Sequence, residues 1–440
     1  MDKKEIDEII SKIEKEDAGF AKKSYLDSLV FPAKIVGRKG HAEELIRFLL
    51  GYRQGFVVPF ISVYGRSGSG KSVTVKYVCE NISEISYCFV NLRQAKTVFG
   101  AANLILAELG EVDLSSAQGI NLAVEKIGGV IESILKKENK KLFVLVLDEY
   151  DVIFYDKRGK PSDFVYKLVR LSEKLREKEL LLCIIGVSNN VLSDYEIDDR
   201  VRSRIGSSEI FFESYSKSDV LDILKERAKE AFSVKIDDAI LKHCAKLSSS
   251  EHGDARRAID LLRVAAELAN SKGEKIAISH VDLASEELQK DRISKVLSGG
   301  SYHFRLASLA LARITFLTGD AWHSTSTLYN QYRTILAKDE KPLSYRRVSE
   351  LLTELENTGL VISQTSSKGR RGYGTQYKLV VSPEMVGKAV DSKWWDDLVK
   401  QKIEHESSTE LGSAFDTKSS LSRSLKRMSQ EIWDQYVGLE

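Results

Sequence analysis

The sequence has no run of 18 or more apolar residues, so we expect no transmembrane helix. Its first residues, MDKKEIDEIISKIEKED, are charged where a secretory signal would be apolar. Only four cysteines occur in 440 residues, and none forms a CxxC pair: Cys79, Cys88, Cys183 and Cys244. We expect these thiols to be buried and reduced, and no Cys/His group has zinc spacing. Together these features predict a cytoplasmic protein that neither contacts a membrane nor carries structural zinc.

The chain also has little net charge, but its charges are unevenly distributed. The 66 Lys and Arg residues nearly balance the 64 Asp and Glu residues, for a net charge of +2. Residues 301–390 hold twelve basic and seven acidic side chains, a net of +5, whereas residues 391–440 have a net of −3. A basic module on an otherwise balanced chain predicts a localised contact with a polyanion.

The length and the order of apolar patterns predict several domains, because 440 residues exceed one hydrophobic core. Residues 1–28 resemble a charged helical arm. Residues 29–212 alternate strand-like and helical patterns, with strands expected at 60–64, 87–90, 142–147 and 181–187. These runs are apolar on both faces, as in a parallel sheet between helices. The pattern predicts an α/β module with a parallel sheet between helices.

The rest of the chain has a different pattern. Residues 213–298 are helical throughout and end at the break Ser298-Gly299-Gly300. Residues 301–390 predict helices near 302–317, 324–337 and 344–357, followed by strands near 360–364 and 376–381. The segment 391–440 opens with Trp394 and Trp395, which either pack on the body of the protein or bind a partner. We therefore expect an all-α domain, a helix–turn–helix module with a hairpin, and a tail of unknown role.

The strongest motif is a phosphate-binding loop that fits GxxxxGK[ST] and directly follows the strand-like run 60–64. Glycines allow the backbone N–H groups of such a loop to surround a phosphate. Lys71 is expected to reach the β and γ phosphates of ATP, and Ser72 to bind Mg²⁺. The expected cofactor-binding residues of this loop are Gly65, Arg66, Ser67, Gly68, Ser69, Gly70, Lys71 and Ser72.

Polar side chains follow two further strand-like runs. Asp148 and Glu149 come at the end of the run 142–147, where open α/β sheets bind ligands. Asp148 is expected to hold Mg²⁺ through water, and Glu149 to orient and deprotonate the attacking water. Asn189 follows the run 181–187 and is expected to hydrogen-bond the γ-phosphate or that water. An ordinary asparagine-capped turn is the alternative for Asn189.

Two later segments give the chain a family resemblance: the loop Asp198–Arg204 and the stretch Gly253-Asp254-Ala255-Arg256. With the motifs above, they resemble the archaeal replication initiators related to origin recognition complex subunit one and cell division control protein six. The resemblance extends from about Ile35 to about Val381. It implies an AAA+ ATPase with a C-terminal winged helix.

The same resemblance assigns roles to individual residues. Lys71 and Ser72 would be the Walker A residues and Asp148 and Glu149 the Walker B residues. Asn189 would be sensor 1, and Arg256 would be sensor 2, a lid residue on the γ-phosphate of its own subunit. Arg204, or alternatively Arg200, would be the arginine finger of a neighbouring site. Val36 and Arg38 would lie on the adenine side.

Two regions are candidates for DNA contact. A helix from about Ser344 carries one apolar face (Val348, Leu351, Leu352 and Leu355) and leaves Tyr345, Arg346 and Arg347 at its outer first turn. The hairpin after it resembles the family's wing and carries Lys368, Arg370 and Arg371 among glycines, suited to phosphates. A winged helix that binds protein is the alternative. Residues 90–99 resemble the family's DNA-touching insertion, with an ordinary surface helix–loop as the alternative.

The resemblance implies an ATP-dependent DNA-replication initiator, associated with the nucleoid, with ATP and Mg²⁺ as cofactors. It would bind double-stranded origin DNA through its winged helix and AAA+ module, and would act as a slow, switch-like ATPase. The implied partners are the replicative helicase, which it would help to load, and copies of itself or paralogues on DNA. Two alternatives are a signalling P-loop ATPase with a winged helix and a DNA-binding transcription regulator with a vestigial site. The lid motif argues against the first, and the intact Walker residues argue against the second.

Overall fold

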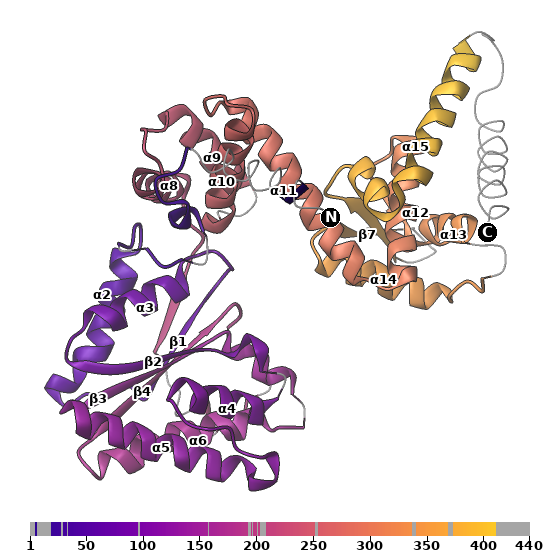
Figure 1. The fold of residues 1–440 in the computed structure, drawn as a ribbon. Helices are drawn as coiled ribbons and strands as arrows, with labels where there is room; N and C mark the ends of the chain where they lie inside the picture. The colour runs from indigo at the N-terminus through magenta and orange to yellow at the C-terminus, as the bar shows by residue number, and fades with distance from the viewer. Residues whose placement is uncertain are drawn as a thin grey trace. The chain divides into compact units, whose positions relative to one another are not determined.

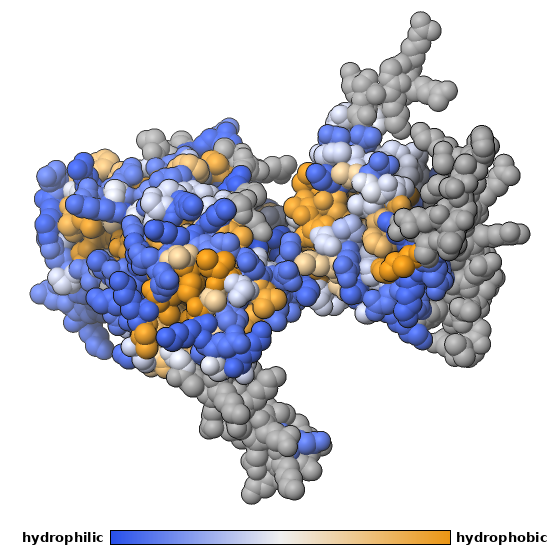
Figure 2. Space-filling view, turned by 90° about the horizontal axis from the view of Figure 1, so that it is seen from above, coloured by the Kyte–Doolittle hydropathy of each residue, from blue (hydrophilic) through white to orange (hydrophobic). Residues whose placement is uncertain are grey.

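A computed structural model divides the chain into two compact units, residues 1–285 and 286–440, and we describe each by itself. The structure describes residues 5–6, 19–27, 30–32, 34–95, 97–156, 158–191, 195, 197–199, 201–202, 208–250, 254–336, 340–367 and 373–410. Within these ranges, no helix is both long and apolar enough to cross a membrane. Figure 2 shows mostly hydrophilic residues on the visible face of each unit, and smaller patches of apolar residues lie among these hydrophilic ones.

The first unit is built on a parallel five-stranded sheet in the order β2-β3-β4-β1-β5. The strands are β1 (Phe60–Gly65), β2 (Ile85–Asn91), β3 (Leu142–Asp148), β4 (Leu181–Ser188) and β5 (Glu209–Phe212). All seven residues of β3 are buried, as its unbroken apolar run predicts for a central strand covered on both faces. The predicted α/β class is therefore confirmed. The edge strand β5 was not predicted, because four residues give too short a pattern to detect.

Helices cover both faces of this sheet (Figure 1). On one face, α2 (Lys39–Leu50) and α3 (Lys71–Asn81) share a buried core with alternate strand residues such as Ile61 and Val146. On the other face, α4 (Val98–Glu108), α5 (Gly119–Glu138) and α6 (Pro161–Arg176) pack with the intervening residues, such as Phe60 and Leu147. Because side chains alternate between the faces of a strand, both cores form from the same strands.

The lid follows β5 as the helices α8 (Lys217–Ala231), α9 (Asp238–Ser250) and α10 (Ala255–Ser271). Ser216 caps α8 in a reciprocal capping box with Asp219. The short helix η1 (Lys23–Leu26), near the N-terminus, packs on the lid helices α8 and α10. The next helix, α11 (Ile278–Gly299), begins in the first unit and ends in the second.

The second unit is a winged helix. It consists of α12 (Tyr302–Thr318), β6 (His323–Ser324), α13 (Thr325–Ile335), α14 (Tyr345–Asn357), β7 (Val361–Ser367), β8 (Tyr373–Leu379) and α15 (Pro383–Glu410). Its antiparallel sheet has the order β6-β8-β7. The apolar face predicted for the helix after Ser344 is buried in this core.

Trp394 and Trp395 pack in this same core, the first of the two alternatives that the sequence left open. Both indoles on α15 are buried, and the ring of Trp395 lies 5.2 Å from that of Phe316 on α12. Lys402 fixes the helix further along, because its Nζ donates a hydrogen bond of 2.7 Å to the carbonyl oxygen of Phe316. The first part of the segment 391–440 therefore packs on the winged helix. Trp433 and Tyr436 lie outside the described residues.

Candidate functional site

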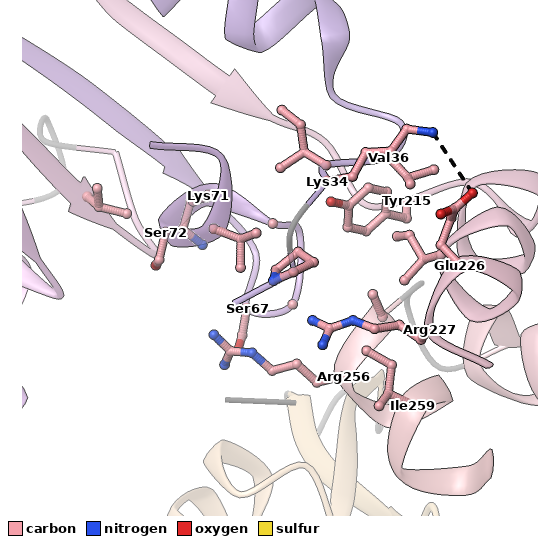
Figure 3. A pocket seen from close by; sticks show the side chains of 18 of the residues that line it. Lys34, Val36, Ser67, Lys71, Ser72, Tyr215, Glu226, Arg227, Arg256 and Ile259 are labelled. Atoms are coloured by element: carbon pink, nitrogen blue, oxygen red, sulfur yellow. Dashed lines mark ion pairs between the residues drawn. The ribbon is translucent and has the colours of Figure 1, made fainter. Parts of the chain in front are cut away.

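A cavity of about 380 Å³ lies in the first unit, at the carboxyl edge of the sheet and under the lid. Three parts of the chain line it, and Figure 3 shows their side chains pointing into it. The loop before α3 and the ends of β3 and β4 form one side, and the lid helices α8 and α10 form another. The third side consists of Tyr25, Pro32 and residues 34–36. The site residues that the structure brings together here are Val36, Ser67, Gly68, Gly70, Lys71, Ser72, Asp148, Glu149, Asn189 and Arg256.

Two positions of the loop require glycine, because of their backbone conformation and because other side chains lie close to them. Gly68 and Gly70 have φ angles of 76° and 86°, in the left-handed region that side chains disfavour. A Cβ at Gly68 would collide with the carboxylate of Asp254, and one at Gly70 with the hydroxyl of Tyr215. The loop thus lies tightly beneath the lid, and its backbone can approach a bound phosphate closely.

Lys71 begins α3 and extends its side chain back across the loop. Its Nζ donates hydrogen bonds to the carbonyl oxygens of Gly65 (2.7 Å) and Arg66 (2.8 Å), and to Oδ1 of Asn189 (3.1 Å). Burial lowers the pKa of Lys71 to about 8, and the nearby Asp148 opposes this shift. A buried cation at the N-terminus of a helix is suited to an anionic ligand.

Asp148 lies deeper in the cavity, with only 7% of its surface exposed. Ser72 Oγ donates to its Oδ1 (2.8 Å), and Asn91 Nδ2 donates to its Oδ2 (3.0 Å). Burial raises the pKa of Asp148, and these two hydrogen bonds lower it in part. A hydroxyl and a carboxylate in contact fit Mg²⁺, which prefers oxygen ligands and keeps several waters. The two residues predicted to bind the metal, Ser72 and Asp148, are thus in contact, and their role at Mg²⁺ stays a prediction.

Asn91 is a site residue that was not predicted. It is the last residue of β2 and pairs in register with Asp148 at the end of β3. Its signal was present, since a polar amide directly follows the apolar run 87–90 that we predicted as a strand. Strands that lie side by side in a parallel sheet bring their end residues together, and strand order was not available from the sequence.

Glu149 follows Asp148 with a φ of 53° and a ψ of 38°, a left-handed conformation that is uncommon for glutamate. Its Oε1 lies 3.7 Å from NH1 of Arg93, a residue of η3 (Leu92–Gln94) that is 75% exposed. Arg256 enters the cavity from the first turn of α10, where the side chain of Asp254 accepts a hydrogen bond from its N–H (2.8 Å). Glu149 therefore reaches the cavity from the end of β3, and Arg256 reaches it from the lid.

Arg38 takes a different place from the nucleotide contact that the resemblance implied. It is 2% exposed, and it does not line the cavity. Its Nε donates to the carbonyl oxygen of Ser69 (2.9 Å), and its guanidinium lies 3.9 Å from the ring centroid of Tyr215. Arg38 thus holds the phosphate loop through the backbone of Ser69, from a buried position outside the cavity lining. Val36, by contrast, lines the cavity as expected.

Five of the predicted residues have no described position. Arg200, Arg204, Lys368, Arg370 and Arg371 lie outside the described residues, so the arginine finger and the tip of the hairpin remain predictions. Arg202, from the same loop as the finger candidates, lies on the surface 3.8 Å from Asp199.

The first turn of α14 presents the predicted DNA-binding residues at the surface. Tyr345, Arg346 and Arg347 are all exposed, and Ser344 caps the helix by accepting the N–H of Arg347 (3.3 Å). Glu350, one turn later, accepts hydrogen bonds from Arg347 NH1 (2.8 Å) and Arg346 Nε (3.3 Å). Two arginines in the first turn of a helix oppose its dipole, and Glu350 offsets part of that repulsion.

Comparison with known proteins matches three segments of the chain to described families. Residues 61–214 match the ATPase family associated with various cellular activities, residues 221–286 the Cdc6 AAA+ ATPase-type lid domain, and residues 295–389 the CDC6 C-terminal winged helix domain. The ORC1-type DNA replication protein of Desulfurococcus amylolyticus is 34% identical over 83% of this chain and 93% of that protein. ORC1-type DNA replication protein 1 of Sulfurisphaera tokodaii is 32% identical over 88% of this chain and 96% of that protein.

A solved structure agrees with these matches. The Aeropyrum pernix ORC1 protein in complex with DNA has a TM-score of 0.69 and 27% sequence identity. The likeness covers 87% of this chain and 98% of that one. The AAA+ module, the lid and the winged helix are therefore shared in the same order along nearly the whole of both chains.

Proposed function

The chain belongs to the family of ORC1-type DNA replication proteins, and from this membership we propose that it is an initiator that binds origin DNA under the control of ATP. Membership of an AAA+ ATPase family supports nucleotide binding and hydrolysis. The family also disfavours the alternatives of a signalling ATPase and a transcription regulator with a vestigial site.

One observation carries the nucleotide part of the proposal: the contact of Ser72 with Asp148 beside the contact of Lys71 with Asn189. The ends of β3 and β4 and the phosphate loop meet at these hydrogen bonds. Mg²⁺ held by Ser72 and Asp148 would neutralise charge on the phosphates of ATP. Lys71 would bind the β and γ phosphates, Glu149 would accept a proton from the attacking water, and Asn189 would hold that water or the γ-phosphate.

Arg256 would complete this site from the lid. An arginine on the γ-phosphate favours a closed lid when ATP is bound and loses its partner when the γ-phosphate leaves. The hydrolysis would therefore serve as a slow switch between two arrangements of the protein. Arg204, or Arg200, would add a second arginine from a neighbouring copy or a paralogue on DNA.

DNA binding would use the outer turn of α14, with Tyr345, Arg346 and Arg347, and the basic tip of the hairpin between β7 and β8. The Aeropyrum pernix ORC1 protein, which shares this fold, is described in complex with DNA, and this supports the proposal. The segment 90–99 would add a contact from the AAA+ module. Its exposed Arg93, close to Glu149, supports a link between that contact and the ATP site. Helicase loading would follow from the same assembly on DNA.

A footprint of the purified full chain across its own replicon, with ATP and with ADP, tests the proposal. We expect a few sites to be protected, and the extent of protection to differ between the two nucleotides. Uniform weak protection of all sequences would contradict origin binding. Identical footprints with ATP, ADP and no nucleotide would contradict the nucleotide switch.

A further inference from the structure

The chain segment before α2 connects the lid to the sheet along one side of the cavity. At its start, the backbone N–H groups of Ala21 and Lys22 donate to the carbonyl oxygen of Ala231 (2.8 and 3.1 Å), at the end of α8. The ring of Phe20 stacks on that of Phe232 at 5.1 Å, and Lys23 Nζ lies 3.0 Å from Glu267 of α10. The lid therefore holds the beginning of this segment through backbone, aromatic and charged contacts.

Further along, the same segment lines the cavity before it joins the sheet domain. Tyr25, Pro32, Lys34, Ile35 and Val36 all contribute to the lining, and α2 begins at Lys39. Lys34 Nζ also reaches across to Glu226 of α8, at 3.9 Å. Because the phosphate loop and the strand ends occupy the polar side of the cavity, these largely apolar residues are the surface left for the base and sugar of a nucleotide.

A single lid side chain fixes the middle of this segment. Arg227, on α8, is 7% exposed and donates from NH1 to the carbonyl oxygen of Tyr25 (3.0 Å) and from NH2 to that of Val30 (2.8 Å). Burial lowers the pKa of Arg227, which means that placing a cation here costs free energy. The two carbonyl groups belong to residues five positions apart, so the forked guanidinium ties two points of the chain to the same helix.

We propose that Arg227 is a positioning residue for the base end of the bound nucleotide. It also lines the cavity, and Figure 3 shows it beside Arg256, both reaching from the lid toward the phosphate loop. The two arginines nevertheless have different roles. Arg256 has an exposed side chain that is available to a phosphate, whereas both terminal nitrogens of Arg227 are engaged with the segment that forms the base end. The inference rests on the proposed nucleotide site.

The test compares three ligands that share adenosine but differ in phosphates. In Arg227→Met, a side chain of similar length loses both hydrogen bonds to the segment. We expect the affinities for ATP, ADP and adenosine to fall by the same factor, about tenfold. Hydrogen bonds that involve a charged group typically change an equilibrium constant by roughly ten- to hundredfold. Tryptic cleavage after Lys34 should become faster at the same time. A matched control is Lys229→Met, an exposed lysine on the same helix, which should change neither.

Other outcomes would overturn the inference. If the affinity for ATP falls while those for ADP and adenosine do not, Arg227 acts on the γ-phosphate and not on the segment. Unchanged affinities for all three ligands would equally exclude a positioning role. If Arg227→Met fails to fold, as judged by its thermal unfolding, Arg227→Lys decides, because a lysine can hold one carbonyl and should show an intermediate, equal loss for all three. Failure of the wild-type chain to bind any of the ligands would instead refute the proposed nucleotide site.

Discussion

Lys71 Nζ and Asn189 Oδ1 lie 3.1 Å apart, and this contact joins the phosphate loop to the end of β4. The two residues are 118 positions apart in the chain, yet the parallel pairing of β1 with β4 brings their strand ends together. The same lysine holds its own loop through two carbonyl oxygens. A bound phosphate would replace these neutral partners with a charged one, which is a stronger hydrogen-bond acceptor.

Replacing Lys71 with alanine should therefore abolish ATP binding. The change removes the principal side-chain charge on the β and γ phosphates and leaves the backbone of the loop in place. Equilibrium binding of labelled ATP measures the effect, with Lys76→Ala on the same helix as a control that should bind normally. An unchanged affinity would refute the role of Lys71.

The lowered pKa of Lys71 predicts a pH dependence of binding. With a pKa of about 8, the free side chain loses its proton as the pH rises through 8, and its attraction for phosphate falls. Bound phosphates should raise this pKa again, so ATP binding near pH 8.5 should take up a fraction of a proton. Calorimetry in two buffers of different ionisation enthalpy would detect that uptake. The absence of this uptake in wild type would contradict a rise in the pKa of Lys71 on ATP binding.

Replacing Glu149 with glutamine should keep ATP bound but stop its hydrolysis. The amide cannot accept a proton from water, whereas Asp148 and its contact with Ser72 are unchanged. Single-turnover hydrolysis of pre-bound ATP separates the two effects. If the rate matches that of wild type, Glu149 is not the base.

Replacing Asn91 with alanine should raise the Mg²⁺ concentration required for half-maximal hydrolysis. Asp148 Oδ2 would lose its donor at 3.0 Å, so its carboxylate would be less firmly oriented and its pKa, already raised by burial, would rise further. A Mg²⁺ titration of ATP turnover measures this, and the loss expected for such a supporting residue is roughly tenfold or more. Asn81→Ala, an exposed asparagine at the end of α3, is the control. Equal Mg²⁺ dependence in all three proteins would rule out a role for Asn91 at the metal.

The residues of this site divide into those that a local pattern reveals and those that it does not. Lys71 and Ser72 belong to a loop motif that directly follows a strand-like run, and Asp148 and Asn189 lie at the ends of two other runs, so each could be predicted from a few neighbouring residues. The buried face of α14 could be predicted from spacing alone. Each of these features depends only on the local period of the chain.

Asn91, Arg38 and Arg227 depend on partners far away in the sequence. Arg38 acts on Ser69 and Glu213, and Arg227 on carbonyl groups about 200 positions earlier. Such contacts follow from strand order and from how the lid packs, neither of which a single sequence displays. The strand β5 was missed for a related reason, because its four residues take their conformation from pairing with β1.

The winged helix offers a test that separates affinity from sequence specificity. Arg347 lies at the first turn of α14, where side chains of a recognition helix reach base edges in the major groove. Arg347→Ala should cost about 1–3 kcal/mol on origin DNA and much less on random duplex. Glu350→Gln is the matched control, because Arg347 donates a hydrogen bond to the carboxylate of Glu350. The change removes that negative charge and should strengthen binding to both DNA sequences.

Replacing Arg370 and Arg371 together should have a different effect, because a glycine-rich basic hairpin is suited to phosphates and to a minor groove. Binding to origin and scrambled DNA should weaken by similar factors. The salt dependence should also decrease by about one unit of slope for each phosphate that the variant no longer binds, since fewer counterions are released. Salt-dependent isotherms on both sequences measure all of this. A winged helix that binds protein would instead give wild-type DNA affinity in every variant. Loss of specificity in the hairpin variant alone would place base readout in the wing and not in α14.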